Sequence, residues 1–237
     1  MKKKFFFKNL FRLIKNKADL KFIFFFINFS LIYFLNKKKI NTYNLSKWND
    51  LTERKKFSQK WFLRNIFFLD KHLIELKSKK NMILEIGSFE GISAVYFLKN
   101  FESSCIVCVD PFTGSDEHEY LKDKSFLEQN FDFNMNEFKD KLTKVKNKSE
   151  TFFKSNKIIF DILYIDGSHE YYDVYKDAIN SYNFCKKGGY LIFDDYFWTF
   201  YQNEKNPLLA INKFYSEKKN SLQLLFLGQQ IIFKKLD

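Results

Sequence analysis

The chain has 237 residues, enough for one α/β domain with an appendage rather than two full domains. Aromatic residues make up 20% of it, whereas there are only 7 Gly and 2 Pro, which excludes collagen-like and flexible low-complexity proteins. The formal net charge of +12 is uneven: residues 1–80 contain 21 Lys and Arg against 5 acids, and residues 81–237 contain 19 against 23. Because the basic excess lies outside the region with chemical motifs, we do not expect a nucleic-acid partner.

Residues 1–40 form a basic, aromatic N-terminal arm with 11 Lys and Arg and a single acid, Asp19. Its apolar stretch at residues 22–35 is only 14 residues long, whereas a helix that crosses a bilayer needs about 20. Three interpretations stay open. The arm binds an anionic membrane surface, packs on the domain or on a second copy of the chain, or, with the least support, spans the membrane.

Short apolar runs alternate with amphipathic stretches throughout residues 81–237, which predicts strands at 82–86, 105–109, 142–149, 158–165 and 190–194. Fully apolar strands separated by helices favour a parallel sheet covered on both faces. Two further strands joined around Gly228 predict an antiparallel hairpin. We therefore expect a Rossmann-like three-layer α/β sandwich with a seven-stranded, mostly parallel sheet. Residues 41–80 precede it as a helical lead-in, with one helix over 61–76.

The stretch EIGSFEG, residues 85–91, follows the first predicted strand. Gly87 and Gly91 allow a sharp turn and a close approach to a ligand, and the next helix directs its N-terminus to the same place. Asp110 ends the second strand, where an acid can accept both hydroxyls of a ribose. The full dinucleotide pattern G-x-G-x-x-G is missing, so NAD is the lesser option. An ordinary strand-to-helix turn is also compatible with this stretch.

Carboxylates follow two more predicted strands. Asp166 comes directly after the strand at 158–165, and Asp194 ends the strand at 190–194, with Asp195 directly after it. Parallel strands present their carboxyl ends at one rim of a sheet, so these groups should meet there. Hard oxygen ligands in that number suit Mg²⁺ or Ca²⁺, although helix capping or solvated loop positions would also use such residues.

These motifs resemble those of the class I S-adenosylmethionine-dependent methyltransferases. ILEIGSFEG is similar to their first cofactor motif, CVDPF to the acidic end of their second strand, and KKGGYLIFDDY to the segment through their fifth strand. Within that class, FDILYIDGSHEYYDVYKDA with LIFDDY resembles a bacterial group that includes macrolide-sugar O-methyltransferases. The resemblance covers about residues 60–237 and does not extend to the first forty.

The resemblance implies a role for each matching residue. S-adenosylmethionine would bind through Glu85, Gly87, Ser88, Gly91, Asp110, Ser149, Glu150 and Asp166. Asp166, Asp194 and Asp195 would hold Mg²⁺, and His169 with Asp166 would be catalytic. The catechol O-methyltransferases keep a lysine base where this chain has His169, so the base is a departure from their pattern, although imidazole titrates nearer neutrality.

The resemblance thus implies a metal-assisted O-methyltransferase that acts on a hydroxyl of a sugar, glycan or other small molecule. The alternative is a non-catalytic protein of the same fold that serves as a scaffold at a membrane surface. With 3 cysteines and no recognisable signal-peptide cleavage pattern, we expect a cytoplasmic protein, peripheral at the inner face of the membrane if the arm binds lipid, and a homodimer if the arm self-associates. Acceptor contacts are also open for the polar loop at 112–123 and for Trp198, Phe200 and Tyr201, for which packing is favoured over sugar stacking.

Overall fold

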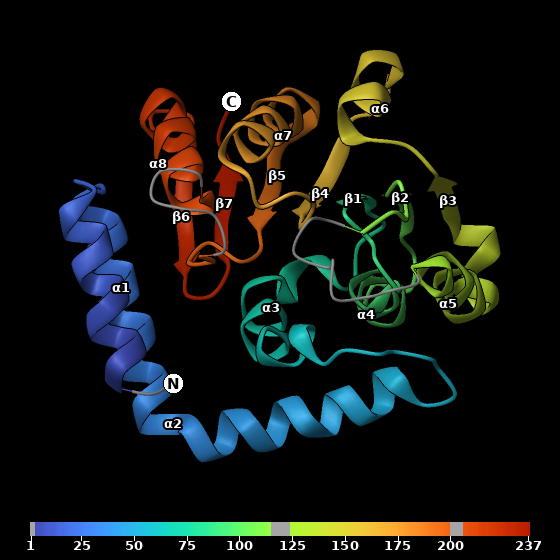
Figure 1. Cartoon of the computed structure of the whole chain (residues 1–237), viewed down its shortest axis with the longest axis horizontal. Helices are drawn as coiled ribbons and strands as arrows, with labels where there is room; N and C mark the ends of the chain where they lie inside the picture. The colour runs from blue at the N-terminus through green and yellow to red at the C-terminus, as the bar shows by residue number, and fades with distance from the viewer. Residues whose placement is uncertain (1–2, 115–123, 200–205) are drawn as a thin grey trace.

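The computed structural model describes residues 3–114, 124–199 and 206–237. Its centre is a seven-stranded sheet with the order β3-β2-β1-β4-β5-β7-β6 (Figure 1). Strand β7 runs antiparallel to β5 and β6, and the other neighbours are parallel. The strands are β1 (Met82–Ile86), β2 (Cys105–Val109), β3 (Leu142–Val145), β4 (Phe160–Ile165), β5 (Cys185–Phe193), β6 (Leu222–Leu227) and β7 (Ile231–Lys235). The predicted sheet and its C-terminal hairpin are confirmed.

Helices cover both faces of this sheet. Figure 1 shows α3, α4 and α5 on one side of it and α6, α7 and α8 on the other. Their bounds are α3 (Ile66–His72), α4 (Ile92–Asn100), α5 (Ser125–Met135), α6 (Ser149–Ser155), α7 (Tyr171–Phe184) and α8 (Pro207–Lys218). The central strands are buried on both faces, with Leu84 and Leu163 fully inaccessible, which explains their uninterrupted apolar sequences. The three-layer prediction is confirmed.

Several local boundaries differ from the prediction. Strand β5 starts at Cys185 rather than at residue 190 and ends at Phe193, and β3 ends at Val145 rather than at residue 149. Strand β4 starts at Phe160 rather than at residue 158, because Ile158 and Ile159 are 40% and 51% exposed and precede the buried run. The helix expected over residues 61–76 is broken into shorter pieces, with 3₁₀ turns η1 (Trp61–Arg64) and η2 (Ile74–Leu76) flanking α3; a further 3₁₀ segment is η4 (Asn136–Lys141). A mixed three- and four-residue spacing fits a broken helix as well as a continuous one.

The N-terminal arm is helical and packs on the domain. Its elements are α1 (Lys3–Lys15) and α2 (Leu20–Thr52). Helix α1 and the first half of α2 form a hairpin beside β6, whereas the second half of α2 passes along α3 and α4 (Figure 1). Helix α2 continues through residue 40, with non-helical angles only at Asn36. The arm and the lead-in are therefore joined by one helix rather than divided at residue 40.

Helix α2 is long and apolar enough to cross a membrane if only length and composition are considered. Its first half, however, contributes Phe22, Phe26 and Phe29 to the protein core. The rings of Phe22 and Tyr215 lie 4.7 Å apart, and those of Phe29 and Phe226 lie 5.5 Å apart. This contact agrees with the packing interpretation for that face of the helix.

Candidate active site

A cavity of about 550 Å³ lies at the carboxyl ends of β1, β2, β4 and β5. This volume is typical of small-molecule sites, which range from about 300 to 1,000 Å³. Glu85 and Gly91 are not among its lining residues. The other residues singled out in the sequence do line it: Gly87, Ser88, Asp110, Ser149, Glu150, Asp166, His169, Asp194 and Asp195. The fold therefore brings together groups that are far apart along the chain.

The loop between β1 and α4 requires glycine at both of its ends. Gly87 and Gly91 have φ angles of 84° and 85°, in the region that side chains disfavour. A Cβ atom on Gly87 would lie 2.1 Å from the carbonyl oxygen of Asp166, and one on Gly91 would lie 3.0 Å from the ring of Phe131. The loop thus crosses the end of β4 in close contact and leads into α4, whose first residues, such as Ile92, line the cavity.

Asp110 holds this glycine loop in place. Its Oδ2 atom accepts hydrogen bonds from the backbone amides of Ser88 and Phe89 at 2.8 and 2.9 Å. Its Oδ1 atom accepts from the amide of Phe112. The carboxylate also lines the cavity, so the ribose contact implied by the resemblance stays a prediction, and the structure adds a role in shaping the loop.

Glu85 lies behind the loop rather than in the cavity. It is fully buried, and neither carboxyl oxygen has a hydrogen-bond partner of acceptable geometry among the described residues. Burial raises the pKa of Glu85, and the nearby hydroxyls of Ser88 and Ser93 partly oppose that rise. The cofactor contact implied for Glu85 by the resemblance stays a prediction, and the structure adds that its side chain does not line the cavity.

Ser149 and Glu150 begin α6 and line another part of the cavity. Beside Ser149 lies Asp177 of α7, which falls within the stretch FDILYIDGSHEYYDVYKDA but was given no role in the sequence interpretation. Asp177 is only 4% exposed. Burial raises its pKa to about 7, with Ser149 opposing the rise and Asp173 adding to it. A carboxyl group that titrates near neutrality thus forms part of the cavity wall.

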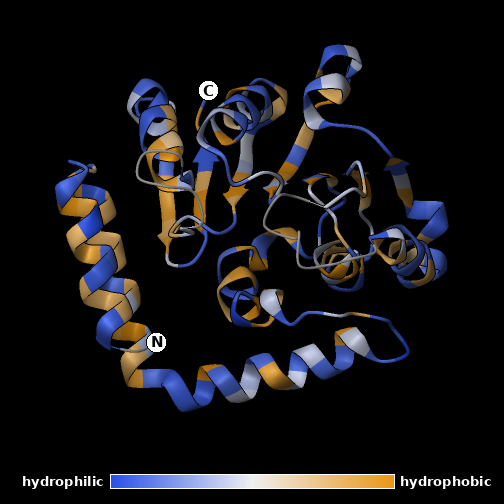
Figure 2. Ribbon diagram, viewed as in Figure 1, coloured by the Kyte–Doolittle hydropathy of each residue, from blue (hydrophilic) through white to orange (hydrophobic). Residues whose placement is uncertain are grey.

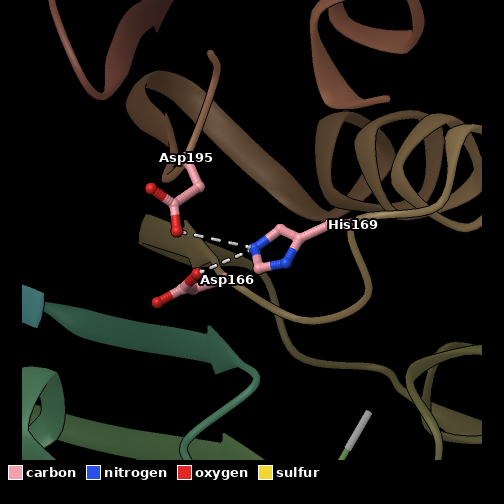
Figure 3. A group of neighbouring side chains, drawn as sticks. All are labelled: Asp166, His169 and Asp195. Carbon is pink, nitrogen blue, oxygen red and sulfur yellow. Dashed lines mark ion pairs between the residues drawn. The ribbon is translucent and has the colours of Figure 1, made fainter. Parts of the chain in front are cut away.

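Asp166, His169 and Asp195 form an acidic cluster at the carboxyl ends of β4 and β5 (Figure 3). Nε2 of His169 lies 3.6 Å from Oδ1 of Asp166 and 3.8 Å from Oδ2 of Asp195. One potential ligand atom from each residue lies within 4.8 Å of the others. Burial and the charge of Asp194 raise the pKa of Asp166. Two carboxylates and an imidazole at this spacing fit a divalent cation, with oxygen favouring Mg²⁺ and nitrogen extending the range to Mn²⁺.

Asp194 lies in a buried hydrogen-bond network beside the acidic cluster. Its Oδ2 atom accepts from the amide nitrogens of Asn65 and Gln230 at 2.8 and 3.1 Å, and from the hydroxyl of Tyr164. Its Oδ1 atom accepts from the backbone amide of Asp195 at 2.7 Å. The resemblance implied a cluster of Asp166, Asp194 and Asp195, whereas the structure groups Asp166 and Asp195 with His169. Asp194 instead links β4, β5 and the start of α3.

Arg64 is a site residue that the sequence interpretation missed. Its guanidinium forms an ion pair with Asp195. The pKa of Arg64 is raised overall. Burial by itself would lower it, but the negative charges of Asp195, Asp194 and Asp166 have the larger effect. The sequence shows only that Arg64 and Asn65 interrupt an apolar stretch, and this does not indicate what the arginine contacts.

The aromatic segment after β5 is described only in part. Trp198 is 36% exposed and its ring lies 5.6 Å from the imidazole of His169, so it borders the acidic cluster rather than the core. Phe200, Tyr201 and most of the polar loop at 112–123, including His118, lie outside the described residues. Their expected roles stay predictions.

The sequence of residues 84–196 matches the family model described as a methyltransferase domain. The match covers a little under half of the chain, and together with the seven-stranded sheet and the glycine loop it agrees with the class I methyltransferase fold that the sequence predicts. A curated relative is an uncharacterized protein, R132, of Acanthamoeba polyphaga mimivirus, which is 31% identical over 133 residues, or 55% of this chain. The match spans only 57% of the viral protein.

Solved O-methyltransferase structures share the fold. The MycE methyltransferase of mycinamycin biosynthesis, solved with Mg, S-adenosylhomocysteine and mycinamycin VI, has a TM-score of 0.56 at 14% identity over 79% of this chain and 54% of its own. TomG of Streptomyces achromogenes, solved with S-adenosylmethionine, has a TM-score of 0.55 at 10% identity over 84% and 90% of the two chains. An O-methyltransferase from Bacillus cereus has a TM-score of 0.52 at 13% identity over 84% and 90%.

Proposed function

We propose that this chain transfers the methyl group of S-adenosylmethionine to a hydroxyl of a sugar or another small molecule, assisted by a divalent cation. The observation that carries the proposal is a single cavity that joins the glycine loop to the cluster of Asp166, His169 and Asp195. The methyltransferase domain match and the ligands named for MycE and TomG support the choice of cofactor and cation.

The residues present fit both groups. The loop at Gly87 has no room for a side chain and brings backbone to the end of β4, as a close-fitting cofactor site requires. Asp166 and Asp195 offer hard oxygen ligands at the adjoining end of the cavity, with His169 Nε2 between them. A cation held there would also compete with Arg64 for Asp195.

When bound, the cofactor supplies a methyl group on a sulfonium, and a divalent cation lowers the pKa of a hydroxyl that it contacts. The chain itself orients the reactants. Asp110 keeps the glycine loop in shape, and Asp166 and Asp195 hold the positive charge near the acceptor. In this proposal the two aspartates, and not His169, are the ligands of the cation, so that Nε2 of His169 accepts the hydroxyl proton, since an imidazole exchanges protons near neutral pH. Trp198 shields the imidazole from solvent on one side.

The first test is calorimetric titration of the full chain with S-adenosylhomocysteine, with and without magnesium. We expect micromolar binding that is lost in Asp110→Ala, followed by an acceptor screen with labelled S-adenosylmethionine. Failure of well-folded protein to bind S-adenosylhomocysteine would contradict the methyltransferase proposal and favour a scaffold of the same fold. Binding followed by turnover that persists fully in chelator would contradict only the cation.

His169 needs a separate test. His169→Ala should leave S-adenosylhomocysteine affinity within about threefold of wild type and lower turnover about 10²- to 10⁴-fold, the usual contribution of a general base. Full activity of His169→Ala from pH 6 to 9 would transfer the role of base to another group, such as Glu170.

A further inference from the structure

Large apolar side chains lie exposed along the outer side of the N-terminal hairpin. In α1 these residues are 57% to 65% exposed, and in the first half of α2 they are 44% to 80% exposed. We call this set the outer apolar face: Phe7, Phe11, Ile14, Leu20, Phe24, Ile27, Leu31, Phe34 and Leu35. Figure 2 shows hydrophobic colour along the hairpin at the edge of the molecule, whereas the second half of α2 is mostly hydrophilic. Exposed apolar side chains in this number on one hairpin are unusual on a protein without a partner.

The spacing of these residues makes each helix two-sided. In α2 the exposed positions Leu20, Phe24 and Ile27 are separated by four and three residues, and the same steps continue to Leu31 and Phe34. This spacing places them on one side of a helix. The buried residues of the same segment, such as Phe22, Phe26 and Phe29, fall on the opposite side. The outer apolar face therefore points away from the domain that the hairpin packs on.

Helix α1 repeats this arrangement. Phe7, Phe11 and Ile14 are exposed at steps of four and three, whereas Asn9 and Leu13 are buried. The two helices are held together by stacking of Phe6 on Phe26, with ring centroids 5.7 Å apart. The outer apolar face is thus built from both helices of one packed unit.

Basic side chains border the outer apolar face. Every lysine that the structure describes between residues 3 and 40 is exposed: Lys3, Lys4, Lys8, Lys15, Lys17, Lys21, Lys37, Lys38 and Lys39. The single acid of residues 1–40 is Asp19, whose side chain caps α2 by accepting from the amide of Lys21. The border of the face is therefore strongly positive.

We propose that the outer apolar face binds an anionic lipid bilayer, with the hairpin lying in the plane of the membrane surface. Apolar side chains entering the headgroup boundary and lysines contacting anionic headgroups are the two contributions that hold such helices at a bilayer. Long lysine side chains can reach the headgroups while their methylenes cover apolar surface. A bilayer therefore matches both the apolar and the charged part of the face.

Charge decides between a bilayer and a second copy of the chain. Two copies joined through this face would bring together two arms that each carry 11 Lys and Arg against one acid, and like charges across an interface oppose association. A membrane span is also disfavoured, because Phe22, Phe26 and Phe29 are already buried in the protein. An anionic surface is the occupant that this charge distribution fits.

The test is flotation of the full-length protein with phosphatidylcholine vesicles that contain or lack phosphatidylglycerol. Wild-type protein should float only with the anionic vesicles, and less at high salt because exposed charges are screened. Phe24→Ser with Leu31→Ser should reduce partitioning more than about tenfold. The matched control is Phe133→Ser, which changes a residue of α5 that is 48% exposed outside the hairpin. It should bind as wild type.

A charge variant tests the second contribution. Substituting Glu for Lys37, Lys38 and Lys39 leaves the outer apolar face intact and should weaken binding at least about fivefold for each charge removed from the surface. Thermal unfolding and S-adenosylhomocysteine binding identify any variant that has lost its fold. Absence of flotation by wild-type protein, or undiminished flotation of the Phe24→Ser, Leu31→Ser variant, would overturn the proposal. A wild-type dimer that this variant dissociates would overturn it in favour of a second copy.

Discussion

Gly87 and Asp166 lie at the ends of different strands, yet a Cβ atom on Gly87 would be 2.1 Å from the carbonyl oxygen of Asp166. The glycine loop between β1 and α4 and the strand β4, at whose end Asp166 lies, are therefore in direct backbone contact. The contact is supported by the hydrogen bond from the amide of Asp166 to the carbonyl of Ile86, at 2.8 Å. A change in the glycine loop should consequently affect the acidic cluster as well.

Gly87→Ala should reduce the free energy of unfolding by about 2 to 5 kcal/mol, combining left-handed backbone strain with overpacking. Gly188→Ala is the matched control, because Gly188 has a φ of 77° and no atom within 4 Å of a built Cβ. It should cost only about 1 to 2 kcal/mol. Urea unfolding measures both values, and equal losses in the two variants would show that the Gly87 contact is unimportant.

Asp194 and Asp195 should respond differently to replacement by asparagine. Asp194→Asn loses acceptor capacity facing Asn65, Tyr164 and Gln230, so unfolding free energy should fall by about 1 to 3 kcal/mol. Asp195→Asn removes an ion pair with an arginine whose side chain is 42% exposed, which should cost less than about 1 kcal/mol. Turnover stimulated by magnesium should nevertheless fall most in Asp195→Asn.

Chemical unfolding and magnesium titration of turnover are the two measurements for this pair of variants. Wild-type stability in Asp194→Asn would mean that its hydrogen-bond network contributes little. Unchanged magnesium dependence in Asp195→Asn would remove that residue from the cation site.

Asp177 should make folding less favourable as pH rises. Burial raises its folded-state pKa from an ordinary 3.8 to about 7, so the folded state binds this proton more tightly than the unfolded state. The contribution of protonated Asp177 to the free energy of unfolding is complete below about pH 4 and is lost as pH rises to about 7. Its upper limit is about 4 kcal/mol. Asp177→Asn should lack this component. Unfolding free energies of both proteins from pH 4 to 8 give the difference, and parallel curves would contradict it.

His72 should act in the opposite direction. Burial lowers its pKa from 6.5 to about 4, with Lys71 adding to the effect, and its ring lies 4.9 Å from that of Phe226. The contribution of neutral His72 to the free energy of unfolding is present above pH 6.5 and is lost as pH falls to about 4. Its upper limit is about 3 kcal/mol. His72→Phe should be less sensitive to acid over that range. An identical acid response in equilibrium unfolding would exclude His72 as its source.

Much of the fold could be predicted because its signals are local. The apolar runs at Met82–Ile86 and Cys105–Val109 coincide with β1 and β2, since strands buried on both faces need uninterrupted apolar sequence. The weakest predicted strand, over residues 142–149, is confirmed as β3 at Leu142–Val145. The helix expected over residues 61–76 was wrong as a continuous element, because tertiary contacts decide how such a stretch breaks.

The sequence by itself determined where the strands lie along the chain, which two glycines need a positive φ, and which carboxylates follow β4 and β5. These features depend on burial patterns and backbone freedom, which are properties of neighbouring residues. Only the tertiary structure decided which side chains meet. Asp195 has a φ of 49° and faces His169 and Arg64, whereas Asp194 beside it enters a buried network. Arg64 and Asp195 are 131 positions apart, and side-chain direction at such distances depends on packing of the whole sheet. The same holds for the hairpin, whose buried and exposed apolar faces are equally apolar in sequence and differ only in what covers them.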